Sequence, residues 1–465
     1  MEQLSGNFTH DCLFFDRQLG AGTNYDVLAR NVHIGSHRGR IWCIDGYADD
    51  TAIERMIAFW LGLPPNAAAA SADEFIARFI TFDEVSPSKD TTELTTNVLS
   101  GKLLLLAEGI GEGILIDAKT VPCRSVEEPG DSRVLRGAHD GFVEALVRNT
   151  ALLRRRIRDP RLRLEGMKIG QKSQTDVVVC YMEGLADENL LRELRQKLDT
   201  LTPDSFSMGQ ESVSEALRGN KKQWYNPLPR IRYTERPDVA AACALEGDIL
   251  LFIDNSPAVM LLPTTLPDFL QEINDFYFPP LVGTYLRFIR LGVLLLSLFI
   301  TPIWYLLAAN SHALPAALDF LAVEGEVHVP LFLQLLLVEF LVDILKLASL
   351  NTPSVLSSSF SMLGALILGD FAVQARWLVP EVLVYMAFVA IAGFTQPSYE
   401  LSYAIKLGRM ALLLCTGLLG WWGFLGGTTL LLLMAATTKP ILGKSYLRPR
   451  RKISLLRRPI RKSNT

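Results

Sequence analysis

The stretch that decides the fold is Arg287–Ala309, which reads RFIRLGVLLLSLFITPIWYLLAA. About 20 consecutive apolar residues are enough for a helix to span the hydrocarbon core of a bilayer. Four more apolar stretches of similar length follow it: Pro330–Leu350, Ser354–Val373, Trp377–Phe394 and Met410–Thr437. The sequence therefore predicts an α-helical transmembrane bundle over residues 283–438.

The sequence before this bundle is charged and irregular, as in a soluble protein. We expect a soluble α/β N-terminal region made of two related mixed α/β subdomains, at residues 1–160 and 161–282, because a domain averages about 150 residues. The segment 439–465 contains ten Lys or Arg residues and no Asp or Glu, so we expect a basic cytoplasmic tail.

Short apolar runs alternate with helical patterns in the N-terminal region. The predicted strands are Cys12–Asp16, Ile41–Asp45, Leu103–Ala107, Gly113–Asp117, Asp176–Met182 and Ile249–Asp254. The predicted helices are Thr51–Leu61, Ala72–Phe79, Asp90–Ser100, Asp140–Arg158, Glu188–Leu201 and Ser212–Leu217.

Two segments of this region resemble each other. Ile41–Asp49 reads IWCIDGYAD and Val179–Asp187 reads VCYMEGLAD. In each segment, an apolar strand is followed by an acidic residue and a glycine. The glycine permits a positive φ at the turn, and the aspartate three residues later can cap the helix that follows. The pattern favours a duplicated strand–turn–helix unit slightly over coincidence between two ordinary turns.

Motifs of enzymes are absent from the sequence. The glycines of Gly109–Gly113 do not form a GxGxxG motif, and Gly170–Ser173 lacks the spacing of a Walker A loop. The six cysteines include no CxxC pair, so reduced and mostly buried thiols are expected. We therefore predict no catalytic residue, no cofactor and no metal site.

A basic cluster runs from Arg154 to Arg163. It could contact an acidic partner or lipid headgroups, but a solvated helix face is the more common arrangement. The N-terminus lacks the basic and apolar regions of a signal peptide, so we expect the soluble region to stay in the cytoplasm.

Charge decides which apolar stretches cross the membrane. With both termini cytoplasmic, the number of crossings must be even, which selects spans at 287–309, 354–373, 377–394 and 410–437. The remaining stretch, 330–350, has a polar stripe formed by Glu339, Asp343 and Lys346, which lie within about 60° on a helix.

Each of these charges would cost roughly 2.5–3.5 kcal/mol at the bilayer centre, so the sequence favours an amphipathic helix lying in the interface. The alternative is a spanning helix whose charges face the interior of the bundle. Lys406 and Arg409 fall in the second outer loop of this topology and weaken its charge pattern slightly.

The stretch Ser354–Val373 presents small residues at helical spacing. Such a face usually packs closely against another helix, but it could also line a narrow pore made by several copies of the chain. The candidate pore-lining residues are Ser354, Ser358, Ser361, Ala365, Gly369, Asp370 and Ala372.

Several motifs resemble one known family, the A subunits of GerA-type spore germination receptors. They are RLEGMKIGQKS at 163–173, YMEG at 181–184, LPTT at 262–265, PLVGTYLR at 280–287, GALILG at 364–369 and FTQPSYEL at 394–401. The segment YTERPDVAA at 233–241 is most similar to the stage V sporulation AF branch of that family.

The resemblance implies a multi-pass protein of the endospore inner membrane with both termini on the core side. It also implies a homo-oligomeric ring that releases monovalent cations during germination, together with other germination proteins of that membrane. Asp370 departs from the family, which often has an uncharged residue at this place. The expected partners are therefore membrane lipid, further copies of the chain and monovalent cations, but no nucleic acid.

The alternative function is a non-conducting membrane scaffold that assembles or amplifies other germination receptors. It predicts that loss of the α/β region abolishes function, whereas substitutions in 354–372 affect only stability.

Overall fold

The computed structural model describes residues 3–118, 138–170, 172–201, 209–218, 225–272, 275, 278–310, 321, 323, 328–351, 372–443 and 445–447. The chain forms two compact units. The α/β unit comprises Met1–Gly219, Ile231–Thr264 and Ile441–Gly443, and the helical unit comprises the remaining residues.

The α/β unit contains two halves with the same order of elements. The first half comprises α1 (Phe8–Leu19), β1 (Val27–Ile34), β2 (His37–Ile44), α2 (Asp50–Leu61), α3 (Ala72–Phe79), β3 (Val85–Ser88), α4 (Thr91–Leu99), β4 (Leu103–Ala107) and β5 (Gly113–Ile116). The second comprises α5 (Leu146–Arg156), β6 (Leu162–Ile169), β7 (Thr175–Met182), α6 (Glu188–Asp199), α7 (Gln210–Arg218), β8 (Arg232–Thr234), α8 (Pro237–Leu245), β9 (Ile249–Ile253) and β10 (Val259–Leu262).

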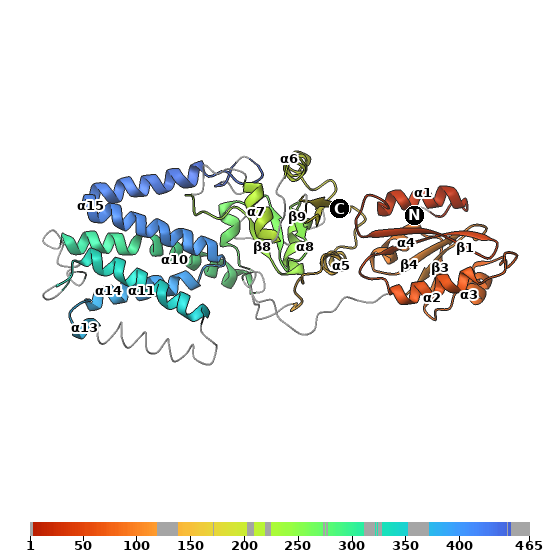
Figure 1. The fold of residues 1–465 in the computed structure, drawn as a ribbon, viewed down its shortest axis with the longest axis horizontal. Coiled ribbons are helices and arrows are strands. Elements are labelled where there is room, and N and C mark those ends of the chain that lie inside the picture. The colour runs from red at the N-terminus through yellow and green to blue at the C-terminus, as the bar shows by residue number, and fades with distance from the viewer. Residues whose placement is uncertain are drawn as a thin grey trace. The chain divides into compact units, whose positions relative to one another are not determined.

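Each half has one five-stranded antiparallel sheet, and the two sheets have equivalent strand orders. The first has the order β1-β2-β4-β5-β3 and the second β6-β7-β9-β10-β8. Helices cover both faces of each sheet, so each half is a three-layer α/β structure (Figure 1). The α/β fold class and the relatedness of the halves, which the sequence predicted, are both present.

The two strand–turn–helix segments have the predicted geometry. Gly46 and Gly184 follow β2 and β7 with φ of 78° and 77°. Asp49 accepts a hydrogen bond from the backbone N–H of Ala52, and Asp187 accepts one from Asn189, so each aspartate caps the helix that follows.

Two local predictions for this region differ from the structure. Cys12–Asp16, predicted as a strand, lies inside α1, which begins after the capping side chain of Asn7. Its buried residues Cys12, Phe15 and Leu19 are spaced three and four residues apart, as on one face of a helix. In addition, α5 packs on the second sheet, although the predicted boundary at residue 160 assigned it to the first subdomain.

A buried ion pair joins the two halves of the α/β unit. Arg154 of α5 donates from Nε to Asp26 Oδ2 at 2.9 Å and from Nη2 to Asp26 Oδ1 at 3.1 Å. Both side chains are almost completely buried. The expectation of a solvated helix face is therefore wrong for Arg154, because the carboxylate of Asp26 compensates its charge inside the protein.

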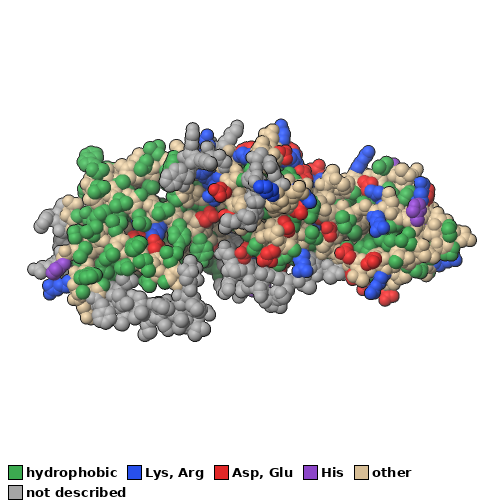
Figure 2. Space-filling view, in the orientation of Figure 1, with side chains coloured by type: hydrophobic (Ala, Val, Ile, Leu, Met, Phe, Trp, Pro, Cys, Tyr) green, Lys and Arg blue, Asp and Glu red, His purple; other side chains and the backbone are tan. Residues whose placement is uncertain are grey.

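The helical unit contains the 3-10 turn η2 (Leu266–Leu270) and the helices α10 (Pro280–Ala309), α11 (Leu331–Asn351), α13 (Ala372–Gln374), α14 (Pro380–Phe394) and α15 (Tyr399–Thr437). In the described part of the chain, α10 and α15 are long and apolar enough to cross a membrane. Hydrophobic side chains gather on the surface of this unit (Figure 2).

The predicted single helix over 410–437 is divided, because α15 reverses direction at Gly420. This residue has φ 59° and ψ −136°. This backbone conformation is not helical, and residues other than glycine rarely adopt it. A Cβ atom on Gly408 would lie 3.5 Å from Leu431, and one on Gly427 would lie 3.4 Å from the Cβ of Cys415. The residues before and after Gly420 thus form the two antiparallel arms of a helical hairpin (Figure 1).

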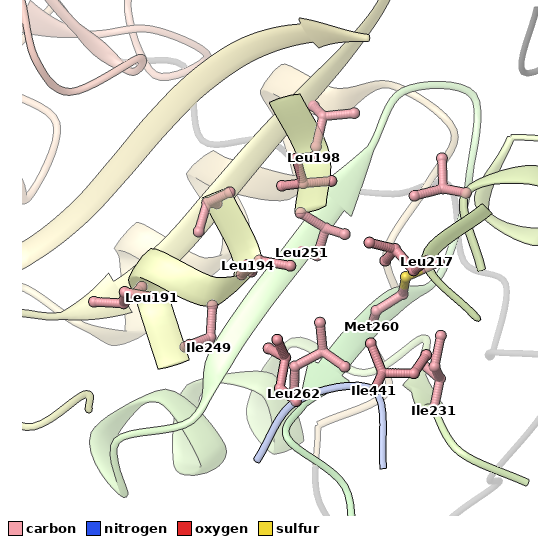
Figure 3. Close-up of a cluster of buried hydrophobic side chains, with 14 of the residues drawn as sticks. Leu191, Leu194, Leu198, Leu217, Ile231, Ile249, Leu251, Met260, Leu262 and Ile441 are labelled. Atoms are coloured by element: carbon pink, nitrogen blue, oxygen red, sulfur yellow. The ribbon is translucent and has the colours of Figure 1, made fainter. Parts of the chain in front are cut away.

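A residue that follows α15 completes the core of the second α/β half. Ile441 lies beside Met260 and Leu262 of β10 in a cluster that includes Leu191, Leu194 and Leu198 of α6 (Figure 3). Lys197 of α6 also donates a hydrogen bond to the carbonyl of Ile441. The same domain core is therefore built from residues on both sides of the helical unit in sequence.

The hairpin predicts that Gly427→Cys forms a disulfide with the native Cys415. The Cβ separation of 3.4 Å is close to that of natural disulfides, about 3.5–4.5 Å. In one continuous helix, positions 415 and 427 would be about 18 Å apart, which is too far to bridge. Oxidation followed by peptide mapping in a mass spectrometer detects the cross-link.

The matched control is the double variant Gly427→Cys/Cys415→Ser, which should give no cross-link at this position. Failure of the single variant to form the 415–427 disulfide in folded protein would contradict the hairpin.

We expect Ile441→Ala to destabilise the second α/β half by about 2–4 kcal/mol, and Ile441→Val by about 1 kcal/mol, because both remove buried methyl groups. Hydrogen exchange of the α6 and β9 amides should accelerate in both variants, and more in Ile441→Ala than in Ile441→Val. The amides of β4 in the first half provide an internal control and should change less. Unchanged protection of α6 in Ile441→Ala would show that Ile441 does not support this core.

Candidate functional site

The candidate site is a network of buried charges in the helical unit, and its centre is the pair Glu339–Arg409. Glu339 of α11 is 3% exposed and Arg409 of α15 is 4% exposed. The guanidinium Nη2 of Arg409 lies 2.6 Å from Glu339 Oε1, and its Nη1 donates to the backbone carbonyl of Ser297 in α10 at 2.9 Å. One side chain thus connects α10, α11 and α15.

A second basic residue of α15 extends the network along α11. Lys406, which is 8% exposed, forms ion pairs with Asp343 and with Glu339 Oε2, the latter at 3.5 Å. Lys406 and Arg409 are three residues apart, and Glu339 and Asp343 are four apart, so each pair lies on one face of its helix. The two faces are complementary in charge.

The remaining charge of the stripe, Lys346, faces aromatic rings. Its Nζ lies 5.1 Å from the ring centre of Phe394 in α14 and 5.9 Å from that of Tyr403 in α15. Both distances are within the range of a cation–π interaction. The polar stripe of α11 is therefore directed toward α14 and α15.

Gln334, on the same helix, makes a neutral connection to α14. It is fully buried, donates to the carbonyl of Val329 at 2.8 Å and accepts from the N–H of Val379 at 2.8 Å. The opposite side of α11 is apolar and exposed through Leu333, Leu337, Phe340, Ile344 and Leu347. Charges inside and apolar residues outside are the arrangement that suits a helix surrounded by lipid.

The structure brings together the three stripe residues that the sequence identified, Glu339, Asp343 and Lys346. It places Ala372 in α13, half-buried against the apolar core of the helical unit. The other candidate pore residues, Ser354, Ser358, Ser361, Ala365, Gly369 and Asp370, lie outside the described residues.

Sequence reasoning did not identify Lys406 and Arg409 as site residues and placed them in a loop. The helix that holds them begins at Tyr399, capped by the side chain of Ser398. The two basic residues are spaced i, i+3 on one helix, and the two acidic residues of 330–350 are spaced i, i+4 on another. These matching spacings of opposite charges are the signal that could have indicated the ion pairs.

The network borders a cavity of about 510 Å³ between α11, the end of α14 and the start of α15. Its lining includes Glu339, Lys346, Lys406 and Arg409 together with Phe394 and Tyr403. In the described part of the chain, no group of three or more His, Cys, Asp or Glu side chains could hold a metal ion.

Comparisons with known proteins extend over nearly the whole chain. Residues 15–464 match the family described as Bacillus/Clostridium GerA spore germination protein. The stage V sporulation protein AF of Bacillus subtilis is 36% identical over 431 residues, which are 92% of this chain and 86% of that protein. The spore germination protein KA of the same organism is 28% identical and covers 92% of this chain and 79% of its own length.

One solved structure is similar to the N-terminal part. It is the N-terminal domain of the A subunit of the Bacillus megaterium spore germinant receptor GerK3, with 27% sequence identity and a TM-score of 0.43. The match covers 56% of this chain and 96% of that domain.

We expect Glu339→Gln to destabilise the helical unit by about 3–5 kcal/mol, because it leaves the guanidinium of Arg409 buried without its carboxylate. Asp343→Asn should cost less, because the Asp343 side chain is one-third exposed. Thermal unfolding of the full chain in detergent measures both effects.

The double variant Glu339→Gln/Arg409→Gln removes the buried charges as a pair and should be more stable than Glu339→Gln alone. Equal stability of Glu339→Gln and the wild-type chain would show that the buried pair does not hold α11 to α15.

Proposed function

The chain belongs to the GerA family of spore germination proteins, and we propose that it is an oligomeric membrane subunit that conducts or gates monovalent cations. The proposed location is the inner membrane of the endospore, where the subunit would release cations from the core during germination. The α/β unit would serve as an assembly collar on the core side.

The observation that carries this proposal is the network of five ionisable side chains between apolar helices. Charged groups are costly inside a membrane, and in membrane proteins they usually mark ion pathways, relays or gates. In this chain the network links α10, α11 and α15, so it could hold a rigid frame against which a conducting segment moves.

The sequence of 354–372 supports a path for ions. Serine hydroxyls at 354, 358 and 361 could replace part of the hydration shell of a cation, and Asp370 would attract cations to one end. A single narrow helix face cannot enclose a pore, so this proposal requires several copies of the chain around one axis.

Surface composition supports assembly in a membrane. Leu418, Leu419, Trp422, Leu430 and Leu432 of α15 are all exposed, and they form an apolar surface that suits lipid or a neighbouring subunit. Trp421 and Trp422 directly follow the reversal at Gly420, where aromatic side chains would favour the membrane–water interface.

A non-conducting scaffold is the second candidate function. It is favoured by the close pairing of Glu339 with Arg409 and of Asp343 with Lys406. Charges that compensate each other can hold helices together without any role in conduction. In that case the exposed apolar surfaces would bind other germination proteins of the spore membrane.

Cation flux from liposomes that contain the purified full-length chain distinguishes the two candidates. We expect potassium efflux from wild-type liposomes and its loss in Ser361→Trp, because the indole would fill a narrow path. Leu418→Trp adds the same side chain at an exposed position of α15 and is the matched control, for which efflux should persist.

Oligomeric mass in detergent is measured on the same samples. A folded oligomer that gives no flux would support the scaffold. Unchanged flux in both Ser361→Trp and Ser358→Trp would show that residues 354–372 do not line the ion path.

A further inference from the structure

The loop that joins α2 to α3, residues 62–71, is attached to the turn between β1 and β2 in the first α/β half. The backbone N–H and the Oγ of Ser36 both donate to the carbonyl of Ala67, at 2.9 and 3.1 Å. Gly35 has φ 57°, and a Cβ atom on it would overlap the carbonyl oxygen of Ala67. The close approach of the loop to the turn therefore requires a glycine at this position.

His37 of β2 makes a further contact with the same loop. Its Nδ1 lies 2.7 Å from the backbone carbonyl of Glu108, and its Nε2 lies 3.0 Å from the backbone nitrogen of Ala69. A carbonyl can only accept a hydrogen bond, and a backbone N–H can only donate one. Nδ1 must therefore carry the proton and Nε2 must be the acceptor, so the ring that makes both bonds is neutral and has one tautomer.

A protonated ring cannot keep the contact with the loop. Imidazolium carries an N–H on both nitrogens and has no acceptor, so its Nε2–H would face the N–H of Ala69. His37 and Ala69 are each only 9% exposed, which leaves little access for water. The His37 ring also packs edge-to-face on Phe75 of α3, with 5.5 Å between ring centres. A buried N–H that loses its acceptor costs free energy, so protonation of His37 disfavours the attached position of the loop.

The carboxylates around this contact remain charged over the range in which imidazoles titrate. Glu108 accepts two hydrogen bonds from Arg38, at 2.7 and 2.8 Å, and Glu74 accepts from the N–H of Ala70 and from Arg78. The hydrogen bond from Arg38 lowers the pKa of Glu108, and those from Ala70 and Arg78 lower the pKa of Glu74. Imidazoles change charge between about pH 8 and pH 5. Among these groups, His37 alone changes its charge in that range.

We propose that His37 makes the α2–α3 loop a pH-sensitive element of the α/β unit. In its neutral form the imidazole accepts from Ala69 and keeps this end of the loop against the β1–β2 turn. Protonation removes the acceptor and releases the loop at Ala69, which belongs to the same apolar core as Phe75 and Phe79. The proposal concerns the α/β unit alone, so it stands whether the chain conducts ions or serves as a scaffold.

Hydrogen exchange of the full-length chain in detergent tests this element. Exchange is measured at about pH 7.5 and about pH 5.5, and each rate is corrected for the intrinsic effect of pH on exchange. We expect the protection of the Ala69 amide to fall about five- to tenfold at the lower pH, which corresponds to the loss of one hydrogen bond. The amides of β4 provide an internal reference and should keep their protection.

Three variants make the result specific. His37→Gln places an amide oxygen near the position of Nε2 and does not titrate, so Ala69 should stay protected at both pH values. His37→Phe fills the space without an acceptor, so protection should be low at both. His33→Gln removes an exposed histidine of the neighbouring strand β1 and is the matched control, which should respond to pH as the wild-type chain does.

Wild-type protection of Ala69 that does not fall on acidification would overturn the proposal, and so would an equal fall in His37→Gln. Loss of the response in His33→Gln would assign it to a different histidine and would overturn the proposal as well. Unchanged protection of β4 shows that a variant is folded. If His37→Phe does not fold, the comparison of the wild-type chain with His37→Gln still decides the question.

Discussion

The ion pair between Glu339 and Arg409 is the interaction on which the helical unit depends. Arg409 holds the carboxylate of α11 and a backbone carbonyl of α10 at the same time. Away from water, neither charge could be buried without the other, so the position of α15 is fixed relative to both helices. The apolar core around Trp304, Leu335, Met386 and Leu413 then packs around this fixed contact.

The reversal at Gly420 changes the argument about membrane topology. The sequence counted five apolar stretches, and an even number of crossings required one of them, 330–350, to lie in the interface. Because the stretch 410–437 is part of a hairpin, the number of apolar helical segments rises from five to six. Six is already even, so an even number of crossings no longer requires α11 to lie in the interface. The inward charges and exposed apolar face of α11 agree with this count. We therefore favour a spanning α11, the alternative that the sequence left open.

Local turn chemistry made much of the α/β unit predictable. Gly46 and Asp49, and their counterparts Gly184 and Asp187, specify a turn and a cap through short-range contacts, so the duplication was readable in the sequence. The errors concern longer-range effects. Arg154 was expected in solvent because its partner, Asp26, is 128 residues away. Lys406 and Arg409 were placed in a loop because hydropathy does not register charges that are compensated by another helix, and a single Gly420 gives no distinct signal within an apolar run.

The central claim is that a membrane unit organised around these buried charges conducts cations as an oligomer. Planar bilayer recording of the purified full-length chain under a potassium chloride gradient tests it most directly. The account predicts unitary currents whose reversal potential shifts toward that of potassium, with a smaller shift in Asp370→Asn. Silent bilayers containing folded oligomers, or currents that reverse toward the chloride potential, would contradict it.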